Sequence, residues 1–134
     1  MKSICPKKYV LEYIFVASPK RLFEYLSTEQ GLSEWYADNV TFKDNIFYFS
    51  WDDSVQRATV VSKKENEYIC FKWMEEENDN YFEFRISSES ISNEITLIIT
   101  DFALENDIKY AEMAWNFAIK KLLRGIGAKL ISTT

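Results

Sequence analysis

The sequence contains no histidine, and that absence excludes several kinds of active site. Histidine is the commonest general base and metal ligand, so histidine-based triads, cysteine–histidine pairs and imidazole metal centres are all ruled out. Only three glycines and two prolines occur, which leaves neither a flexible linker nor a glycine-rich phosphate loop. The two cysteines, Cys5 and Cys70, form no CxxC motif and no metal-ligand spacing. Isolated thiols of this kind are typical of a reduced compartment, and we expect a cytoplasmic protein.

Positive charge is also scarce. The formal net charge is −5, and the lysines occur as scattered pairs rather than as a patch, so we expect no nucleic-acid partner. No hydrophobic run approaches the ~18 consecutive apolar residues of a membrane-spanning helix. The first residues also lack the apolar stretch of a secretion signal. We therefore expect no transmembrane segment and no leader peptide.

Aromatic side chains, in contrast, are abundant. They make up 16% of the 134 residues, against 28% charged residues. Each buried ring removes a large apolar area from water, so the chain can build a stable core without disulfides. The length suits one domain, and we expect a single domain over residues 1–134.

The hydrophobic pattern predicts mostly strands, with helices near the start and at the end. Ser18 and Pro19 suit the start of a first helix over residues 20–27, and a second helical turn is expected over residues 32–36. Asp44-Asn45 is a hairpin turn signal. A long helix over residues 108–130 carries an apolar stripe that includes Trp115. Alternation predicts strands over residues 9–16, 40–43, 46–50, 55–62, 68–73, 81–87 and 94–102.

This order of elements predicts an α+β fold. Strands joined by tight turns are antiparallel neighbours, so the sheet should be antiparallel and contain about six to seven strands. Two short helices follow the first strand. One face of the sheet must be covered, and the C-terminal helix is the only predicted element long enough to cover it.

Several segments resemble the START-like superfamily with its helix-grip fold, and most closely the family of the activator of heat-shock protein 90-kDa ATPase. Residues 17–28 (ASPKRLFEYLST) resemble the family's Ala-x-Pro stretch running into the first helix. Residues 31–37 (GLSEWYA) resemble its Leu-x-x-Trp-aromatic segment, residues 71–73 (FKW) resemble its strand ending in Trp, and Trp115 matches a recurrent aromatic of the last helix. The resemblance covers about the whole chain. It implies a curved antiparallel sheet wrapped around the long helix, with a cavity between them.

Nine side chains are candidates for lining such a cavity. Most are aromatic, as the walls of small-molecule sites tend to be. The alternative is that these rings fill the interior solidly. Arg57 could anchor a ligand carboxylate, or else pair with a neighbouring acid on the exposed sheet face. The candidates are Trp35, Tyr36, Trp51, Arg57, Phe71, Trp73, Phe84, Tyr110 and Trp115.

No residue set predicts a catalytic or metal site, and we expect no cofactor. Asp38, Asp52, Asp53 and Asp101 are interpreted as residues of turns and strand ends, where Asp is common for backbone reasons.

Three functions remain open. The first is a non-catalytic binding domain for an apolar or amphipathic small molecule, including lipids. The second is a chaperone co-factor or other protein-interaction module. The third is a cyclase- or aromatase-like enzyme, a class that the superfamily also contains. Such an enzyme would need Tyr110 or Arg57 beside an acid in the cavity. Whether the chain is an enzyme stays open, and the non-enzymatic interpretation is favoured. The outward faces of the first and last predicted strands are apolar, which suggests a homodimer interface or a covered sheet face. They carry Val10, Ile14, Val16 and Ile98.

Overall fold

The computed structural model describes residues 5–89 and 91–133. It confirms the α+β class and the two short helices after the first strand. The helices are α1 (Pro19–Ser27), α2 (Glu29–Trp35) and α3 (Ile108–Ile126), and a short 3-10 helix (Glu105–Asp107) precedes α3. The strands are β1 (Lys7–Val16), β2 (Asn39–Lys43), β3 (Ile46–Trp51), β4 (Ser54–Lys64), β5 (Tyr68–Trp73), β6 (Phe82–Ser88), β7 (Glu94–Ala103) and β8 (Leu130–Thr133).

All eight strands form one antiparallel sheet in the order β2-β3-β4-β5-β6-β7-β1-β8. From β2 to β7 each strand pairs with the next one in the chain, as tight connections require. The predicted turn between β2 and β3 is present, and both of its central residues have positive φ, 55° for Asp44 and 65° for Asn45. This backbone matches the twist of two-residue hairpins, and Asp and Asn tolerate it.

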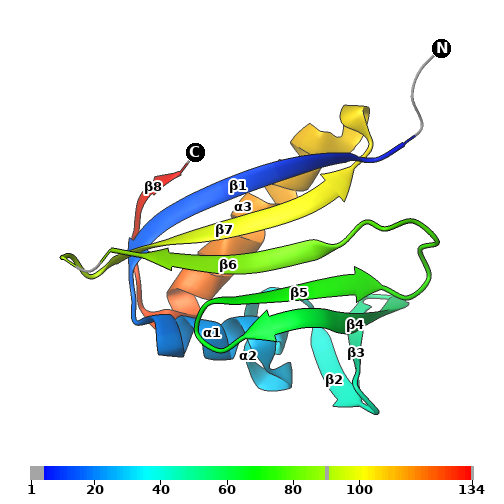
Figure 1. The fold of residues 1–134 in the computed structure, drawn as a ribbon, viewed down its shortest axis with the longest axis horizontal. Helices are drawn as coiled ribbons and strands as arrows, with labels where there is room; N and C mark the ends of the chain where they lie inside the picture. The colour runs from blue at the N-terminus through cyan, green and yellow to red at the C-terminus, as the bar shows by residue number, and fades with distance from the viewer. Residues whose placement is uncertain (1–4, 90, 134) are drawn as a thin grey trace.

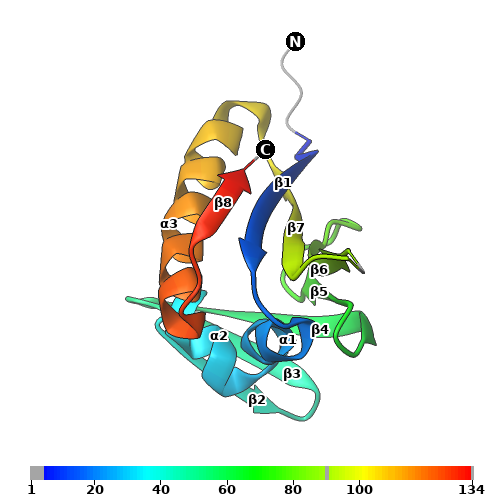
Figure 2. The same ribbon diagram turned by 90° about the vertical axis from the view of Figure 1, so that its left-hand side faces the viewer.

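The sheet curls around α3, so the predicted helix-grip arrangement is confirmed. Figure 1 shows α3 running behind the central strands, and Figure 2 shows it covering one face of the sheet. The short helices α1 and α2 lie beside the C-terminal end of α3 (Figure 2). Side chains that point toward α3 are therefore enclosed between two layers.

Strand β1 shows the expected alternation. Leu11, Tyr13 and Phe15 are buried, while Val10 and Val16 are exposed on the other face. The same period of two places alternate residues of β6 and β7 in the core. The core of the molecule therefore lies between the inner face of the sheet and the three helices.

The last helix is shorter than the sequence pattern predicts. It ends at Ile126 rather than near residue 130, because Gly127 adopts a left-handed conformation with φ 74°. The amides of Gly127 and Ala128 bond back to the carbonyls of Arg124 and Leu123, which closes the helix. The chain then turns into β8, a strand that the sequence analysis missed, and this strand pairs with β1 beside α3 (Figure 2).

The close junction of α1 and α2 explains why residue 31 is a glycine. A Cβ on Gly31 would lie 2.3 Å from the carbonyl oxygen of Glu24 and 2.5 Å from the Cα of Tyr25. No side chain fits at that distance, so glycine is required for the two helices to approach. The N-caps of both helices are side-chain oxygens: Ser18 accepts a hydrogen bond from the amide of Arg21, and Thr28 accepts one from the amide of Gly31.

Candidate functional site

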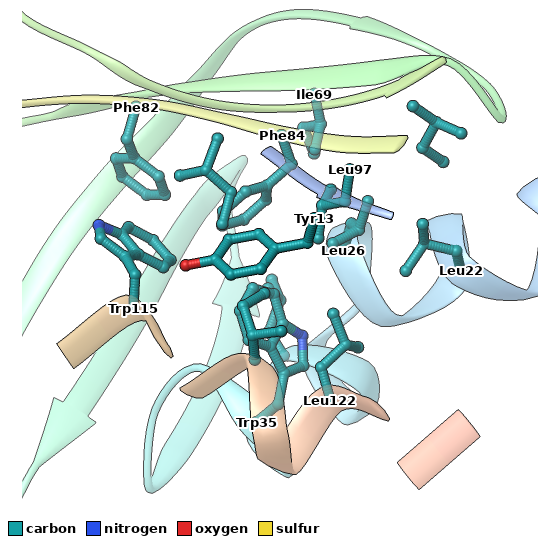
Figure 3. Close-up of a cluster of buried hydrophobic side chains, with 14 of the residues drawn as sticks. Tyr13, Leu22, Leu26, Trp35, Ile69, Phe82, Phe84, Leu97, Trp115 and Leu122 are labelled. Carbon is teal, nitrogen blue, oxygen red and sulfur yellow. The ribbon is translucent and has the colours of Figure 1, made fainter. Parts of the chain in front are cut away.

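An aromatic cluster joins α2, α3 and the inner face of the sheet. Trp35 lies 5.3 Å from Phe84 and 6.4 Å from Trp115 between ring centroids. Tyr36 stacks on Trp115 at 5.6 Å and meets Trp51 edge-on at 5.4 Å. Figure 3 shows Trp115 reaching from α3 toward Phe82 and Phe84 of the sheet, with Trp35 approaching from α2. Aromatic side chains from α2, α3 and the sheet therefore converge on one region.

The cluster does not fill this region completely. A cavity of about 390 Å³ remains between α3 and the aromatic rings, and we call it the α3 cavity. On its sheet and α2 sides the walls are large rings, whereas α3 contributes small residues at several positions. It is lined by Trp35, Tyr36, Trp51, Asp101, Ala111, Ala114, Trp115, Phe117, Ala118 and Lys121.

The α3 cavity has one partly buried carboxylate in its wall. Asp101 lies opposite Tyr9 in the pairing of β7 with β1. Its Oδ2 atom accepts a hydrogen bond of 2.9 Å from the Tyr9 hydroxyl and one of 3.2 Å from the indole Nε1 of Trp115. The same indole nitrogen also donates to the Tyr9 oxygen at 3.0 Å. The three side chains thus form a closed polar group that connects α3 to two strands.

Burial controls the acidity of this group. Loss of hydration raises the pKa of Asp101, although the Phe102 backbone amide, Tyr9 and Trp115 each act in the opposite direction. Burial, followed by the charge of Asp101, raises the pKa of the Tyr9 hydroxyl. Burial also raises the pKa of Tyr36 well above its ordinary value, with contributions from Asp101 and Tyr9. At neutral pH the hydroxyls of Tyr9 and Tyr36 are therefore protonated.

Four of the nine predicted cavity residues line the α3 cavity: Trp35, Tyr36, Trp51 and Trp115. Three more belong to the solid aromatic core behind it. Phe71 and Phe84 are fully buried, and Trp73 packs on Phe82 with 4.8 Å between ring centroids. For these three the alternative of a filled interior describes the structure better.

Arg57 and Tyr110 lie outside the α3 cavity. The Nε atom of Arg57 is 2.8 Å from the Oε1 atom of Glu75 in an exposed ion pair, which is the alternative that the sequence analysis left open. Tyr110 is 74% exposed on the solvent side of α3. Their predicted placement in the cavity is corrected here, because strand and helix registers point them to the surface.

Asp101 is the site residue that sequence reasoning missed. It lies two residues before the end of β7, as expected for an aspartate near a strand end, but it also lines the cavity. A signal was available in the apolar neighbours on its strand, since a charge amid such residues needs a partner.

Within residues 5–89 and 91–133, no three of His, Cys, Asp or Glu lie close enough together to hold a metal ion. No helix in the same part of the chain is long and apolar enough to cross a membrane.

A second, larger hollow of about 560 Å³ lies where α1 and α2 meet the hairpin of β2 and β3. Much of its wall is polar, including Thr28, Glu29 and Lys63. None of the predicted cavity residues reaches it. Its walls include Phe42 and Phe47, whose tilted rings have centroids 4.5 Å apart at the sheet edge. We therefore regard the α3 cavity as the candidate site.

Comparison with known proteins agrees with this architecture. The solution structure of BfR322 from Bacteroides fragilis is similar, with 29% identity and a TM-score of 0.64, and the match covers 93% of this chain and 92% of the other. The Aha1 dimer from Colwellia psychrerythraea gives 14% identity and a TM-score of 0.74, over 90% and 96% of the two chains. CalU16 from Micromonospora echinospora gives 12% identity and a TM-score of 0.67, over 87% and 72%. At such low identities the last two show a shared fold alone.

The sequence matches none of the curated proteins. The family model of the START-like superfamily domain, however, matches residues 4–128, which is nearly the whole chain. This match agrees with the curled sheet, the long C-terminal helix and the cavity between them. The chain therefore belongs to the START-like superfamily.

Proposed function

We propose that this protein is a non-catalytic binding domain that holds an apolar or amphipathic small molecule in the α3 cavity. The observation that carries the proposal is the cavity itself. Its volume of about 390 Å³ falls within the range of ligand sites, roughly 300–1,000 Å³. Mostly apolar walls with a few polar groups are what such sites require.

The sequence of α3 supports this function. Ala111, Ala114 and Ala118 recur at three- and four-residue steps, so they share one face of the helix, and all three line the cavity. Opposite them stand the rings of Trp35 and Trp51. Leucine at any of these alanine positions would occupy part of the open space. The small residues therefore keep the cavity open.

A fluorescence titration with N-phenylnaphthylamine, a neutral apolar probe, tests the proposal. We expect saturable binding to the wild-type protein with an emission increase. Ala118→Leu should weaken binding by about tenfold or more, because the larger side chain fills part of the cavity. Lys120→Leu is the control, since Lys120 is exposed on α3 and does not line the cavity. Absence of binding to the wild-type protein, or equal effects of the two variants, would refute the proposal.

Native mass spectrometry of protein purified from its own cells complements this titration. A retained mass that is released on denaturation and is lost in Ala118→Leu would identify the natural ligand.

The enzymatic alternative has less support, because it placed Arg57 or Tyr110 beside an acid in the cavity. Both side chains lie at the surface instead.

One observation favours protein interaction as a second candidate function. Tyr110, Met113 and Phe117 lie along one side of α3 and are 74%, 61% and 58% exposed. Large apolar side chains in a row on a surface helix are typical of interfaces. Homodimerisation would bury them. Sedimentation velocity of the wild type and of Met113→Lys tests this: a wild-type dimer that dissociates in the variant supports it, and a wild-type monomer at high concentration rejects it.

A further inference from the structure

The carboxylate of Asp101 has no cationic partner in the described part of the chain. The ion pairs there join Lys7 with Glu105, Arg57 with Glu75, Lys64 with Glu67 and Arg85 with Glu83. Asp101 instead accepts hydrogen bonds from two neutral donors, Tyr9 and Trp115. Neutral donors stabilise a carboxylate but leave its net charge in place. A charge removed from water without an opposite charge is costly, and a cationic ligand would compensate it.

The aromatic rings around Asp101 also favour a positively charged ligand. The side chains of Trp35, Tyr36, Trp51 and Trp115 line one cavity. Aromatic faces carry negative electrostatic potential and attract ammonium groups, most strongly when water is excluded. Several indole and phenol rings next to a carboxylate make up the kind of environment that recognises organic ammonium ions.

We propose that the natural ligand carries a protonated amine that pairs with Asp101 while its apolar body occupies the aromatic part of the α3 cavity. This inference rests on the proposed function and narrows it to a chemical class, amphipathic amines. The amine meets the carboxylate of Asp101 among the aromatic side chains that line the cavity. The alanine face of α3 accommodates the apolar body.

Among the residues that the structure describes, Lys121 is the one cation that lines the same cavity, and its charge repels an amine. Its Nζ atom lies 5.2 Å from the ring centroid of Phe117, on the exposed side of α3. Water screens a charge at that place more than it screens the partly buried Asp101. The carboxylate therefore dominates inside the cavity, and removing the lysine charge should help an amine to bind.

Three probes with the same phenylbutyl body and different head groups test the inference. Phenylbutylamine is cationic, phenylbutanol is neutral and phenylbutanoate is anionic at pH 7.5 or nearby. Their dissociation constants are measured by competition with N-phenylnaphthylamine. We expect the amine to bind about tenfold or more tightly than the alcohol, and the anion most weakly, since a charge-assisted hydrogen bond is gained only by the amine.

Asp101→Asn should abolish the preference for the amine. Asparagine retains an oxygen that can accept from Tyr9 and Trp115, so the fold should persist, and the amine is compared with the alcohol within each variant. Asp107→Asn is the matched control: it removes the same charge from an exposed residue just before α3 and should leave the preference unchanged. Lys121→Gln should raise amine affinity about twofold or more.

Each failure has a separate meaning. Equal affinities for amine and alcohol in the wild type would overturn the inference while the proposed function stood. A preference that survives in Asp101→Asn would also overturn it. If N-phenylnaphthylamine itself failed to bind the wild type, the proposed function would fall first, and the inference with it. A preference for phenylbutanoate would assign the site to anions through Lys121 and reverse the inference.

Discussion

Replacing Phe84 tests whether this ring belongs to the solid core or to the wall of a cavity. The side chain is fully buried, and its ring centroid lies 5.3 Å from that of Trp35 and 5.8 Å from that of Trp115. Truncation of a buried Phe to Ala costs ~3–5 kcal/mol, and each aromatic pair adds ~0.5–1.5 kcal/mol beyond area burial. We therefore expect Phe84→Ala to lose about 4–5 kcal/mol of unfolding free energy.

Urea unfolding followed by tryptophan fluorescence measures this loss. A domain of this size is stable by only ~5–15 kcal/mol, so Phe84→Leu, with an expected loss of about 1–2 kcal/mol, is measured as well. Phe117→Ala is the matched control, because that ring is 58% exposed on α3 and its removal should change stability by ~0.5 kcal/mol at most. If Phe84→Ala lost no more than Phe117→Ala, the ring would not be packed as described, and the cavity would extend to β6.

Three further predictions concern other parts of the molecule. Gly31→Ala should cost ~1–3 kcal/mol or more, because the new Cβ would lie 2.3 Å from the Glu24 carbonyl oxygen; thermal unfolding tests this, and an unchanged Tm would contradict the tight helix junction. Burial raises the pKa of the Cys70 thiol to about 11, so in a Cys5→Ser variant labelling by a thiol reagent should be slow until the protein unfolds; rapid labelling under native conditions would contradict its burial. Because burial raises the pKa of Asp101, the folded protein binds a proton on this carboxylate more tightly than the unfolded chain does. Relative to Asp101→Asn, the wild type should therefore be least stable above that raised pKa. Its stability should recover as the pH falls toward the ordinary Asp pKa of about 3.9. Tm values of both proteins across this pH range measure the effect, and a constant difference would contradict it.

Local patterns in the sequence predict most of the sheet. Alternation and turn signals place every strand from β1 to β7 within about two residues of its observed ends. In β1, β3 and β6 the buried residues alternate with more exposed ones, as the pattern requires. Strand β8 is different. Its residues are all exposed, and its only partner, β1, lies more than a hundred positions earlier in the chain. Neither periodicity nor a local turn reports such a pairing, so the sequence pattern extends the last helix to residue 130, where β8 begins, and predicts no strand after it.

The candidate site is predictable only in part. Trp35 and Trp115 were expected to line a cavity and do so, but Phe84 was expected there for the same reasons and is solid core. What separates these rings is the size of the residue that faces them across the interior. Ala114 and Ala118 leave space beside Trp35 and Trp115 in the cavity. Phe84, in contrast, is surrounded by other rings. That pairing is set by tertiary packing, which the sequence order does not display.

The position of α3 is what links this packing to function. The Tyr13 hydroxyl donates to the Asn116 side chain at 2.5 Å, and the Tyr25 hydroxyl donates to the Gly125 carbonyl at 3.0 Å, so β1 and α1 both anchor the helix. A third anchor, from Trp115 to Asp101, is itself part of the cavity wall. A ligand that pairs with Asp101 therefore binds to a group that also holds α3 in place. Because such a ligand binds the folded state alone, it should raise the Tm, and the rise should grow with the logarithm of its affinity. The amine of the phenylbutyl series should then stabilise the protein more than the alcohol does at equal concentration, and Asp101→Asn should remove that difference.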